Sequence, residues 1–516
     1  WGGEVFIVDL ADGGRRLLRI DTKSGRPASV GSDAISQLRN EFGAYIGMQA
    51  TPVIGSVRLP DGTRERRLYV GVNSADQTLW CVNLDAVAAD RAMLDSDSGD
   101  AYFCSSPAGA TVWPRSLEPS SGNRTTGNLN GPPTFSADQP ILDPKTGQTV
   151  VRDVLYAPST GLECSNAEFW AIDAYTGEVF WTWDPVVVEG GGGGIIWTTP
   201  AMNRDRTMIY VTTGDCVTGP HMGELAESLV ALDTATGEVI WHHQRRLVDA
   251  ADMDIGNGPL VADVDGYGGC HVVVSSDKDG CIYGFPQERD LPEVGDPSYD
   301  PLRTGQQRLL YRKCFTPGSL NGGFNASNPA FHERWAMQQA AGYPAGHVGA
   351  DDANAFALDV CNGRVAWASS SISNGRADAA VASGMLFQLG ITRKTAGDYP
   401  YEFVREIQVV PVWNDTLAAP VALATVKLPA QGTLGGGGVA IAKGRIYVPT
   451  TEGIAVVAVV PGSNASPPIR RGNEIFAGPY PHPMSPALAT LPPVDPDHPY
   501  PLLLDKEIER LQSYRD

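Results

Sequence analysis

Ala171–Trp181 (AIDAYTGEVFW), Ala231–Trp241 (ALDTATGEVIW) and Ala357–Trp367 (ALDVCNGRVAW) can be laid over one another without a gap. Each stretch is typical of a strand, a tight turn and a returning strand, because its Asp and Gly have turn-forming chemistry. A Trp occupies the same place on every returning strand. The first two of these Trp residues are 60 positions apart and the last two 126, close to two such periods. The sequence therefore predicts one β-structured unit that repeats along the chain.

Two further elements recur and are predicted to be strands. The first is a short apolar core, usually with a central aromatic residue, which suits a buried strand. It occurs as Leu68-Tyr-Val, Leu155-Tyr-Ala, Ile209-Tyr-Val, Leu386-Phe-Gln and Ile446-Tyr-Val. The second is a strand start, usually with Pro, where Pro removes no ladder hydrogen bond. It occurs as Ala50-Thr-Pro-Val, Gly131-Pro-Pro-Thr, Thr198-Thr-Pro-Ala and Asn257-Gly-Pro-Leu. With the Trp hairpins, these elements predict about four strands in each unit.

Residues 1–461 have room for eight such units of about 58 residues each. A four-stranded sheet cannot bury its own faces, so the units are expected to stack radially as blades. The ring is expected to close by pairing the chain ends, with Val5–Asp9 as the closing strand. The sequence therefore predicts an all-β fold, an eight-bladed β-propeller of four-stranded antiparallel blades. A pair of β-sandwiches is the alternative, which the in-phase Trp repeats disfavour.

The end of the chain differs in composition from the repeats. Twelve of the 41 residues from Pro461 to Pro501 are Pro, which predicts an extended segment of polyproline II character. After it, Leu504, Ile508 and Leu511 are spaced as on one face of a short amphipathic helix. We therefore expect a propeller over 1–461 and a Pro-rich arm over 462–516. The arm either packs on its own propeller or binds another protein.

The charge balance excludes two classes of partner. A formal net charge of −20 and a pI near 4.8 repel both nucleic acid and anionic membranes. No run of about 18 apolar residues occurs, so the sequence predicts no membrane-spanning segment.

Cysteines and glycosylation sequons bear on the compartment. None of the eight Cys residues forms CxxC or CxxCH, which disfavours a zinc knuckle and a covalently attached c-type haem. Four Asn-x-Ser/Thr sequons begin at Asn123, Asn325, Asn414 and Asn464. We expect a periplasmic or extracellular protein with disulfides, whose pairing the sequence does not give. The alternative is a reduced protein with buried free thiols.

The Trp-bearing repeats resemble those of the PQQ-type (quinoprotein) eight-bladed propellers, which include methanol and polyvinyl-alcohol dehydrogenases. The resemblance covers roughly residues 45–460 and is clearest over 150–290. This repeat is specific for the fold but not for catalysis, because non-enzymatic scaffold proteins carry it too.

Two segments resemble the metal-binding parts of that family. Ser159-Thr-Gly-Leu-Glu163 resembles the family's Ser-Gly-x-Glu segment, which implies that Thr160 contacts the cofactor and Glu163 binds the metal. Tyr210-Val-Thr-Thr-Gly-Asp215 aligns with a strand that ends in a ligating Asn, and here Asp215 takes that place. The alternatives are a solvated loop Glu and an ordinary turn Asp.

Two further segments resemble the parts that hold the quinone. Gly190–Trp197 resembles the Gly-rich loop that ends in the Trp beneath the cofactor, which implies that Trp197 stacks on a flat tricyclic ring. Ser276–Tyr283 resembles the hairpin whose Lys polarises a quinone carbonyl, a role that falls to Lys278. The alternatives are a core Trp that packs blades together and a surface Lys in a hairpin turn.

Asp252-Met-Asp254-Ile-Gly-Asn257 resembles the segment that carries the family's catalytic Asp. The resemblance implies that Asp252 takes the alcohol proton beside a metal ion that acts as a Lewis acid. Asp254, two residues on, resembles the extra acidic ligand of the lanthanide-using subgroup. The alternative is an acidic loop without catalytic function.

The resemblance implies a PQQ-dependent alcohol dehydrogenase with Ca²⁺ or a lanthanide, in which an Asp assists hydride transfer to the quinone. Two departures favour a non-catalytic scaffold subunit of a larger assembly instead. The adjacent Cys pair of the methanol-dehydrogenase branch is absent, since Cys104 is followed by Ser105, and no haem motif is present. An enzyme would therefore pass its electrons to a separate acceptor protein. The order and spacing of the candidate residues favour the enzyme.

Overall fold

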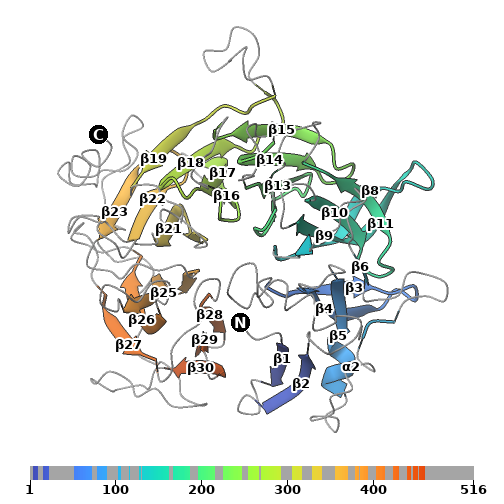
Figure 1. Cartoon of the computed structure of the whole chain (residues 1–516), viewed down its shortest axis with the longest axis horizontal. Helices are drawn as coiled ribbons and strands as arrows, with labels where there is room; N and C mark the ends of the chain where they lie inside the picture. The colour runs from blue at the N-terminus through green and yellow to red at the C-terminus, as the bar shows by residue number, and fades with distance from the viewer. Residues whose placement is uncertain are drawn as a thin grey trace. The chain divides into compact units, whose positions relative to one another are not determined.

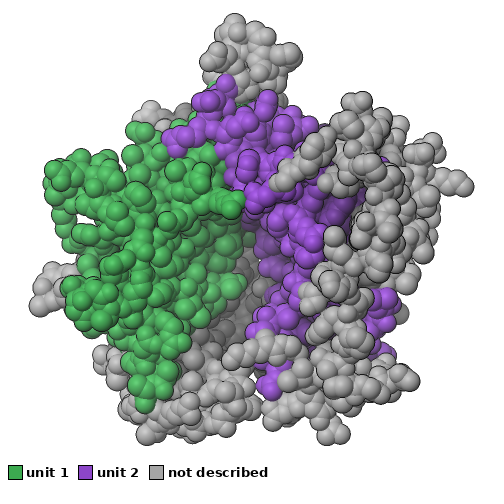
Figure 2. Space-filling model, turned by 180° about the vertical axis from the view of Figure 1, so that it is seen from behind, with its two compact units in different colours: residues 1–254, 300–307 green, residues 255–299, 308–516 purple. Residues whose placement is uncertain are grey.

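The chain is described by a computed structural model in which two compact units can be told apart. Unit 1 comprises residues 1–254 and 300–307, and unit 2 comprises residues 255–299 and 308–516 (Figure 2). The described residues are 4–9, 15–21, 51–72, 78–89, 103–105, 115–116, 127–128, 131–161, 167–185, 194, 196–214, 223, 225–246, 254–265, 269–291, 305–315, 328–339, 355–369, 378–382, 384–392, 403–412, 422–428, 438–442, 445–450 and 453–458. The predicted arm 462–516 and its helix lie outside them.

The described residues of unit 1 form four antiparallel sheets and one short helix, α2 (Leu84–Ala89). The first sheet is β1 (Glu4–Asp9) with β2 (Arg15–Asp21). The second is β3 (Val53–Arg58), β4 (Arg64–Val72), β5 (Thr78–Asn83) and β6 (Arg115–Ser116). The third is β7 (Gly127–Asn128), β8 (Thr134–Leu142), β9 (Thr149–Gly161), β10 (Glu168–Asp173) and β11 (Val179–Trp183). The fourth is β12 (Ala201–Met202), β13 (Met208–Thr212), β14 (Ser228–Asp233) and β15 (Val239–Gln244).

In the part of unit 2 that the structure describes, the strands form four more antiparallel sheets (Figure 1). The first is β16 (Leu260–Val264), β17 (Cys270–Ser276), β18 (Cys281–Pro286) and β19 (Tyr311–Cys314). The second is β20 (Ala330–His332), β21 (Trp335–Gln339), β22 (Ala355–Asp359) and β23 (Val365–Ser369). The third is β24 (Ala380–Ala382), β25 (Met385–Thr392), β26 (Phe403–Pro411) and β27 (Ala424–Lys427). The fourth is β28 (Ala440–Ala442), β29 (Arg445–Thr450) and β30 (Gly453–Ala458).

The all-β propeller architecture with antiparallel blades is confirmed, but the predicted number of blades is wrong. The described residues form seven blades of three to five strands, and β1 and β2 form only a two-stranded sheet. The estimate of eight divided the chain into equal units, whereas several blades contain long connections. One of them runs from Pro286 at the end of β18 to Tyr311 at the start of β19. Val5–Asp9 lies within β1, which pairs with β2, and its role as a closing strand stays a prediction.

The predicted Trp hairpins form as expected. In the first of them, the Asp173 carboxylate accepts hydrogen bonds from the backbone N–H groups of Tyr175 and Thr176, both at 2.8 Å. Gly177, at φ 75°, closes the turn by donating its N–H to the carbonyl of Asp173. Only Gly adopts this φ without strain, and the Gly residues at the same place in the other two repeats, Gly237 and Gly363, are also at positive φ.

Two of the three repeated Trp residues, Trp181 and Trp367, join neighbouring blades. The Trp181 indole N–H of β11 donates to the carbonyl of Thr234, which follows β14, at 3.1 Å. A Cβ on Gly237 would lie 2.6 Å from the Trp181 ring, so only Gly allows this packing. In unit 2, the Trp367 indole donates to the carbonyl of Val412 at 3.0 Å. The core of each unit therefore lies between successive sheets, where apolar side chains of both pack together.

Three disulfides lie among the described residues: Cys81–Cys104, Cys270–Cys361 and Cys281–Cys314. No described cysteine is free. The expectation of disulfides is thereby confirmed, while the other two cysteines, Cys164 and Cys216, lie outside the described residues. Across the described part of the chain, no helix is long and apolar enough to span a bilayer.

Candidate active site

The candidate residues that the structure describes lie at one end of their blades. We call this the upper end, where the first strand of a blade begins and its second strand ends. The pairing of β8 with β9, where Thr134 faces Tyr156, places Thr160 of β9 at this end. Trp197 comes just before β12, and Lys278 comes just after β17, so each lies at the upper end of its own blade.

Of the other candidate residues, the structure describes some and not others. Glu163, Asp215, Asp252 and the side chain of Thr160 lie outside the described residues, so their roles stay predictions. Asp254 is described and is buried, with 4% of its surface exposed. Within the described ranges no group of three or more His, Cys, Asp or Glu residues is placed to hold a metal ion.

Lys278 lies in the turn Asp277–Gly280 between β17 and β18. The turn is closed by the N–H of Gly280, which donates to the carbonyl of Asp277 at 3.0 Å, and Gly280 has φ 80°. Only 4% of the Lys278 surface is exposed, and Asp277 is fully buried. A buried Lys in a hairpin turn is unusual, because a surface Lys keeps its ammonium in water. Lys278 is therefore not a surface residue, contrary to the alternative given by the sequence.

Trp197 follows a segment in which the backbone is tightly packed. A Cβ on Gly194 would lie 2.5 Å from Cβ of Thr213 and 3.0 Å from the carbonyl oxygen of Gly214, so Gly is required there. Next to Trp197, the buried Thr198 hydroxyl shares a hydrogen bond with the hydroxyl of Thr212. Trp197 itself is half-buried. Its indole is thus held on a rigid backbone and keeps some accessible surface, as a stacking residue needs.

A polar network follows the upper ends of the blades in unit 2. The Ser276 hydroxyl accepts hydrogen bonds from the side-chain amides of Asn257 and Gln338, both at 2.9 Å. Asn257 comes from its own blade and Gln338 from the next one. Ser276, two residues before Lys278, is therefore fixed by groups from two blades, which positions the start of the turn.

The network continues through two residues that sequence analysis missed. The Asn328 side-chain oxygen accepts the N–H of Gly258 at 2.8 Å. The Asp378 carboxylate accepts the backbone N–H of Asn328 at 2.7 Å and its side-chain N–H at 3.2 Å. Asn328 precedes a Pro at the start of β20, much as Asn257 stands two residues before Pro259 at the start of β16. That shared pattern was a usable signal for Asn328, whereas Asp378 had none.

Burial raises the pKa of the Asp378 carboxyl, and the hydrogen bonds from Asn328 offset part of the rise. A carboxyl whose pKa is raised in the folded state binds its proton more tightly there than in the unfolded chain. Its contribution to stability is therefore present at low pH and is lost as pH rises from the unfolded value, about 3.9, through the folded value. Above that window, the ionised carboxylate keeps its desolvation cost.

Asp378→Asn should remove this pH dependence, because the amide oxygen still accepts from Asn328 but carries no charge. We expect the stability of the wild type relative to Asp378→Asn to fall as pH rises from about 4, and then to level off. Urea unfolding of both proteins across that range measures the difference. A relative stability of the wild type that increases with pH would contradict the assignment.

Comparison with known proteins supports the resemblance found in the repeats. Residues 144–290 match the model of the family described as "PQQ: Glucose/ethanol/alcohol dehydrogenase, beta-propeller domain". The chain is a relative of the PQQ-type β-propellers. The matched stretch contains all seven candidate residues, from Thr160 to Lys278.

Several characterised proteins are similar to the chain. A polyvinylalcohol dehydrogenase of Pseudomonas sp is 22% identical over 381 residues, which cover 66% of this chain and 54% of that protein. A polyvinylalcohol dehydrogenase of Sphingopyxis sp. (strain 113P3) is 25% identical over 364 residues, covering 54% of this chain and 51% of that protein. The chain thus spans about half the length of these relatives. The crystal structure of the quinohemoprotein alcohol dehydrogenase from Comamonas testosteroni superposes with a TM-score of 0.48 at 16% identity, covering 86% of this chain and 68% of that one.

Proposed function

We propose that the chain is a PQQ- and metal-dependent alcohol dehydrogenase. The observation that carries the proposal is that the family match over 144–290 contains every candidate residue, one of which, Lys278, is a buried cationic side chain in a turn. Burial of an ammonium is costly unless hydrogen-bonding or charged groups face it, and a quinone oxygen would be one such group.

The candidate residues would have different roles in this reaction. Thr160, Trp197 and Lys278 would bind PQQ, the first by its hydroxyl, the second by stacking and the third by a hydrogen bond to a quinone oxygen. The carboxylates of Glu163, Asp215, Asp252 and Asp254 suit a hard cation, Ca²⁺ or a lanthanide. When bound, the quinone supplies a two-electron acceptor for the hydride of the alcohol. Asp252 would take the hydroxyl proton.

The remaining features of the proposal concern partners and compartment. Disulfides form and persist in oxidising compartments, which supports a periplasmic or extracellular enzyme. An electron acceptor in that compartment would be a separate protein. The Pro-rich arm 462–516 is the segment we would expect to bind a protein partner.

One observation favours the alternative, a scaffold subunit without catalysis. Cys104 is bonded to Cys81, a strand residue of β5, and is not part of an adjacent Cys pair. The chain thus lacks a feature of the methanol-dehydrogenase branch that it resembles. A scaffold would keep the blades and use the arm, and it would need neither Asp252 nor Lys278.

The two functions are separated by a dye-reduction assay. Purified protein supplied with PQQ and with Ca²⁺ or a lanthanide should reduce an artificial electron acceptor when given an alcohol. Asp252→Asn should lower the rate about 10²–10⁴-fold, since a general base contributes that much. The matched control is Asp263→Asn, an acid of β16 hydrogen-bonded to the exposed His271 at 2.7 Å, which should leave the rate unchanged. Absence of dye reduction with every metal and alcohol would favour the scaffold.

A further inference from the structure

The turn that carries Lys278 is tied to the strand beyond it by a set of contacts that the proposed function does not use. Asp279, the next residue, accepts hydrogen bonds from the N–H of Cys281 at 2.8 Å and from the hydroxyl of Tyr283. Arg312 of β19 donates to the same carboxylate at 3.4 Å, and its guanidinium lies 5.5 Å from the centre of the Tyr283 ring. The carboxylate therefore joins the turn to both β18 and β19.

A covalent bond reinforces this attachment. Cys281 and Cys314 face each other in the pairing of β18 with β19, and their side chains form a disulfide. Immediately beyond it, the N–H of Phe315 donates to the carbonyl of Gly280, the last residue of the turn, at 2.9 Å. The C-terminal half of the turn is thus held by a disulfide and a backbone hydrogen bond from a strand that begins 33 residues after Lys278 in the sequence.

We propose that the Cys281–Cys314 disulfide and Asp279 form a clamp that positions Lys278. The proposal rests on the proposed function, in which Lys278 meets the quinone. Asp279 and the two cysteines are positioning residues, because they act on Lys278 only through the backbone of the turn. Positioning matters because misplacement by about 1 Å costs a catalytic group about 100-fold in rate.

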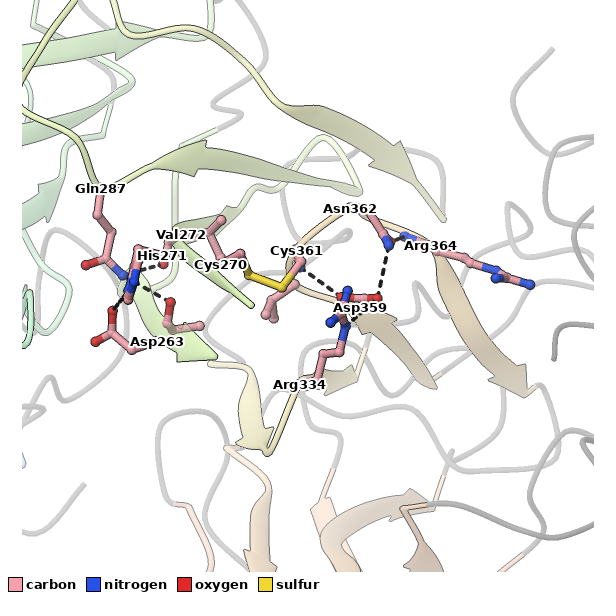
Figure 3. The surroundings of a disulfide bond; sticks show 12 residues. Asp263, Cys270, His271, Val272, Gln287, Arg334, Asp359, Cys361, Asn362 and Arg364 are labelled. Carbon is pink, nitrogen blue, oxygen red and sulfur yellow. Dashed lines mark hydrogen bonds and ion pairs between the residues drawn. A yellow bond between two sulfur atoms is a disulfide. The ribbon is translucent and has the colours of Figure 1, made fainter. Parts of the chain in front are cut away.

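The same unit provides a matched control. Cys270, the first residue of β17, is bonded to Cys361 in the turn between β22 and β23 of the next blade (Figure 3). Cys270 is at the opposite end of β17 from Ser276 and the Lys278 turn. Its disulfide joins residues that are 91 positions apart in the sequence, whereas Cys281 and Cys314 are 33 positions apart. Because the longer loop loses more entropy when closed, the control disulfide should matter more for stability.

The clamp predicts that the two disulfides have different effects on Lys278. Protein without PQQ would be treated with an amine-acetylating reagent. Peptide mass spectrometry would then measure the rate at which each Lys is acetylated. Exposed Lys145 and Lys427 serve as internal references. In Cys281→Ser/Cys314→Ser protein, Lys278 should be acetylated about tenfold faster or more relative to these references, because local opening exposes buried groups. In Cys270→Ser/Cys361→Ser protein, its rate should stay at the wild-type value although Tm falls further.

Asp279→Ala, with both disulfides intact, tests the clamp even where a cysteine variant does not fold. It should also raise the Lys278 rate while leaving Tm nearly unchanged. An unchanged Lys278 rate in Asp279→Ala and in the Cys281/Cys314 variant would overturn the clamp, as would an equal rise in the Cys270/Cys361 variant.

Activity separates a failure of the clamp from a failure of the proposed function. The labelling experiment contains no PQQ, so its result stands whether or not the chain is a dehydrogenase. If the wild type reduces dye and the Cys281/Cys314 variant does so with the same kcat, the function holds and the clamp is wrong. If Lys278 labelling responds as expected but no variant reduces dye, the clamp holds and the dehydrogenase proposal fails.

Discussion

Trp241→Ala is expected to lower the free energy of unfolding by about 3–5 kcal/mol, the range typical of a buried Trp truncated to Ala. Trp241 is fully buried in β15, opposite Ala231 of β14, and its ring lies 5.7 Å from that of Tyr210. Removing the indole leaves a cavity on one face of a sheet whose strands are paired by backbone hydrogen bonds and relax little. Guanidinium denaturation followed by circular dichroism measures the loss.

Val239→Ala is the control for this substitution. Val239 lies on the same strand two residues before Trp241, but 39% of its surface is exposed. Its truncation should cost about 0.5 kcal/mol or less, as for most surface changes. If the two variants lost similar stability, the repeated Trp would not be the main packing residue of its blade.

Lys278→Ala is expected to lower kcat about 10²–10³-fold, the usual cost of removing one group that stabilises developing negative charge. The reason is that alanine cannot donate a hydrogen bond to the quinone oxygen. Dye reduction with PQQ and metal at saturation measures kcat, and a thermal melt checks that the blade still folds.

Lys145→Ala is the matched control for Lys278→Ala. Lys145 is also a turn residue, but 69% of its side chain is exposed and it pairs with Glu178 at 2.7 Å. Its loss should leave kcat unchanged, because surface pairs contribute little. Full activity in Lys278→Ala would contradict the role assigned to Lys278.

The parts of the fold that depend on neighbouring residues could be predicted from sequence. The turn after Asp173 is one example, because an Asp that accepts two backbone N–H groups and a Gly at positive φ act within five residues. The indole hydrogen bond of Trp181 could not be predicted, since its acceptor, Thr234, belongs to another blade. The number of blades was wrong because connection lengths carry no strand signal.

In the candidate site too, features set by residues close in sequence could be predicted, and features set by distant residues could not. The position of Lys278 in a turn after a strand could be predicted from sequence. The hydrogen bond from Gln338 to Ser276 could not, because it joins two blades and residues 62 positions apart. Asp378 was missed because it acts on Asn328, 50 residues away in sequence. The Cys270–Cys361 pairing was equally hidden, as eight cysteines allow many connectivities.

The most direct test of the dehydrogenase proposal is a titration of the cofactor-free protein with PQQ, in the presence of Ca²⁺ or a lanthanide, followed by Trp fluorescence. Saturable quenching of the wild type at one PQQ per chain is expected. The affinity of Lys278→Ala for PQQ should be weaker by about tenfold or more, because loss of a hydrogen bond to a charged group raises Kd by at least that factor. Absence of saturable binding with every metal would contradict the proposal.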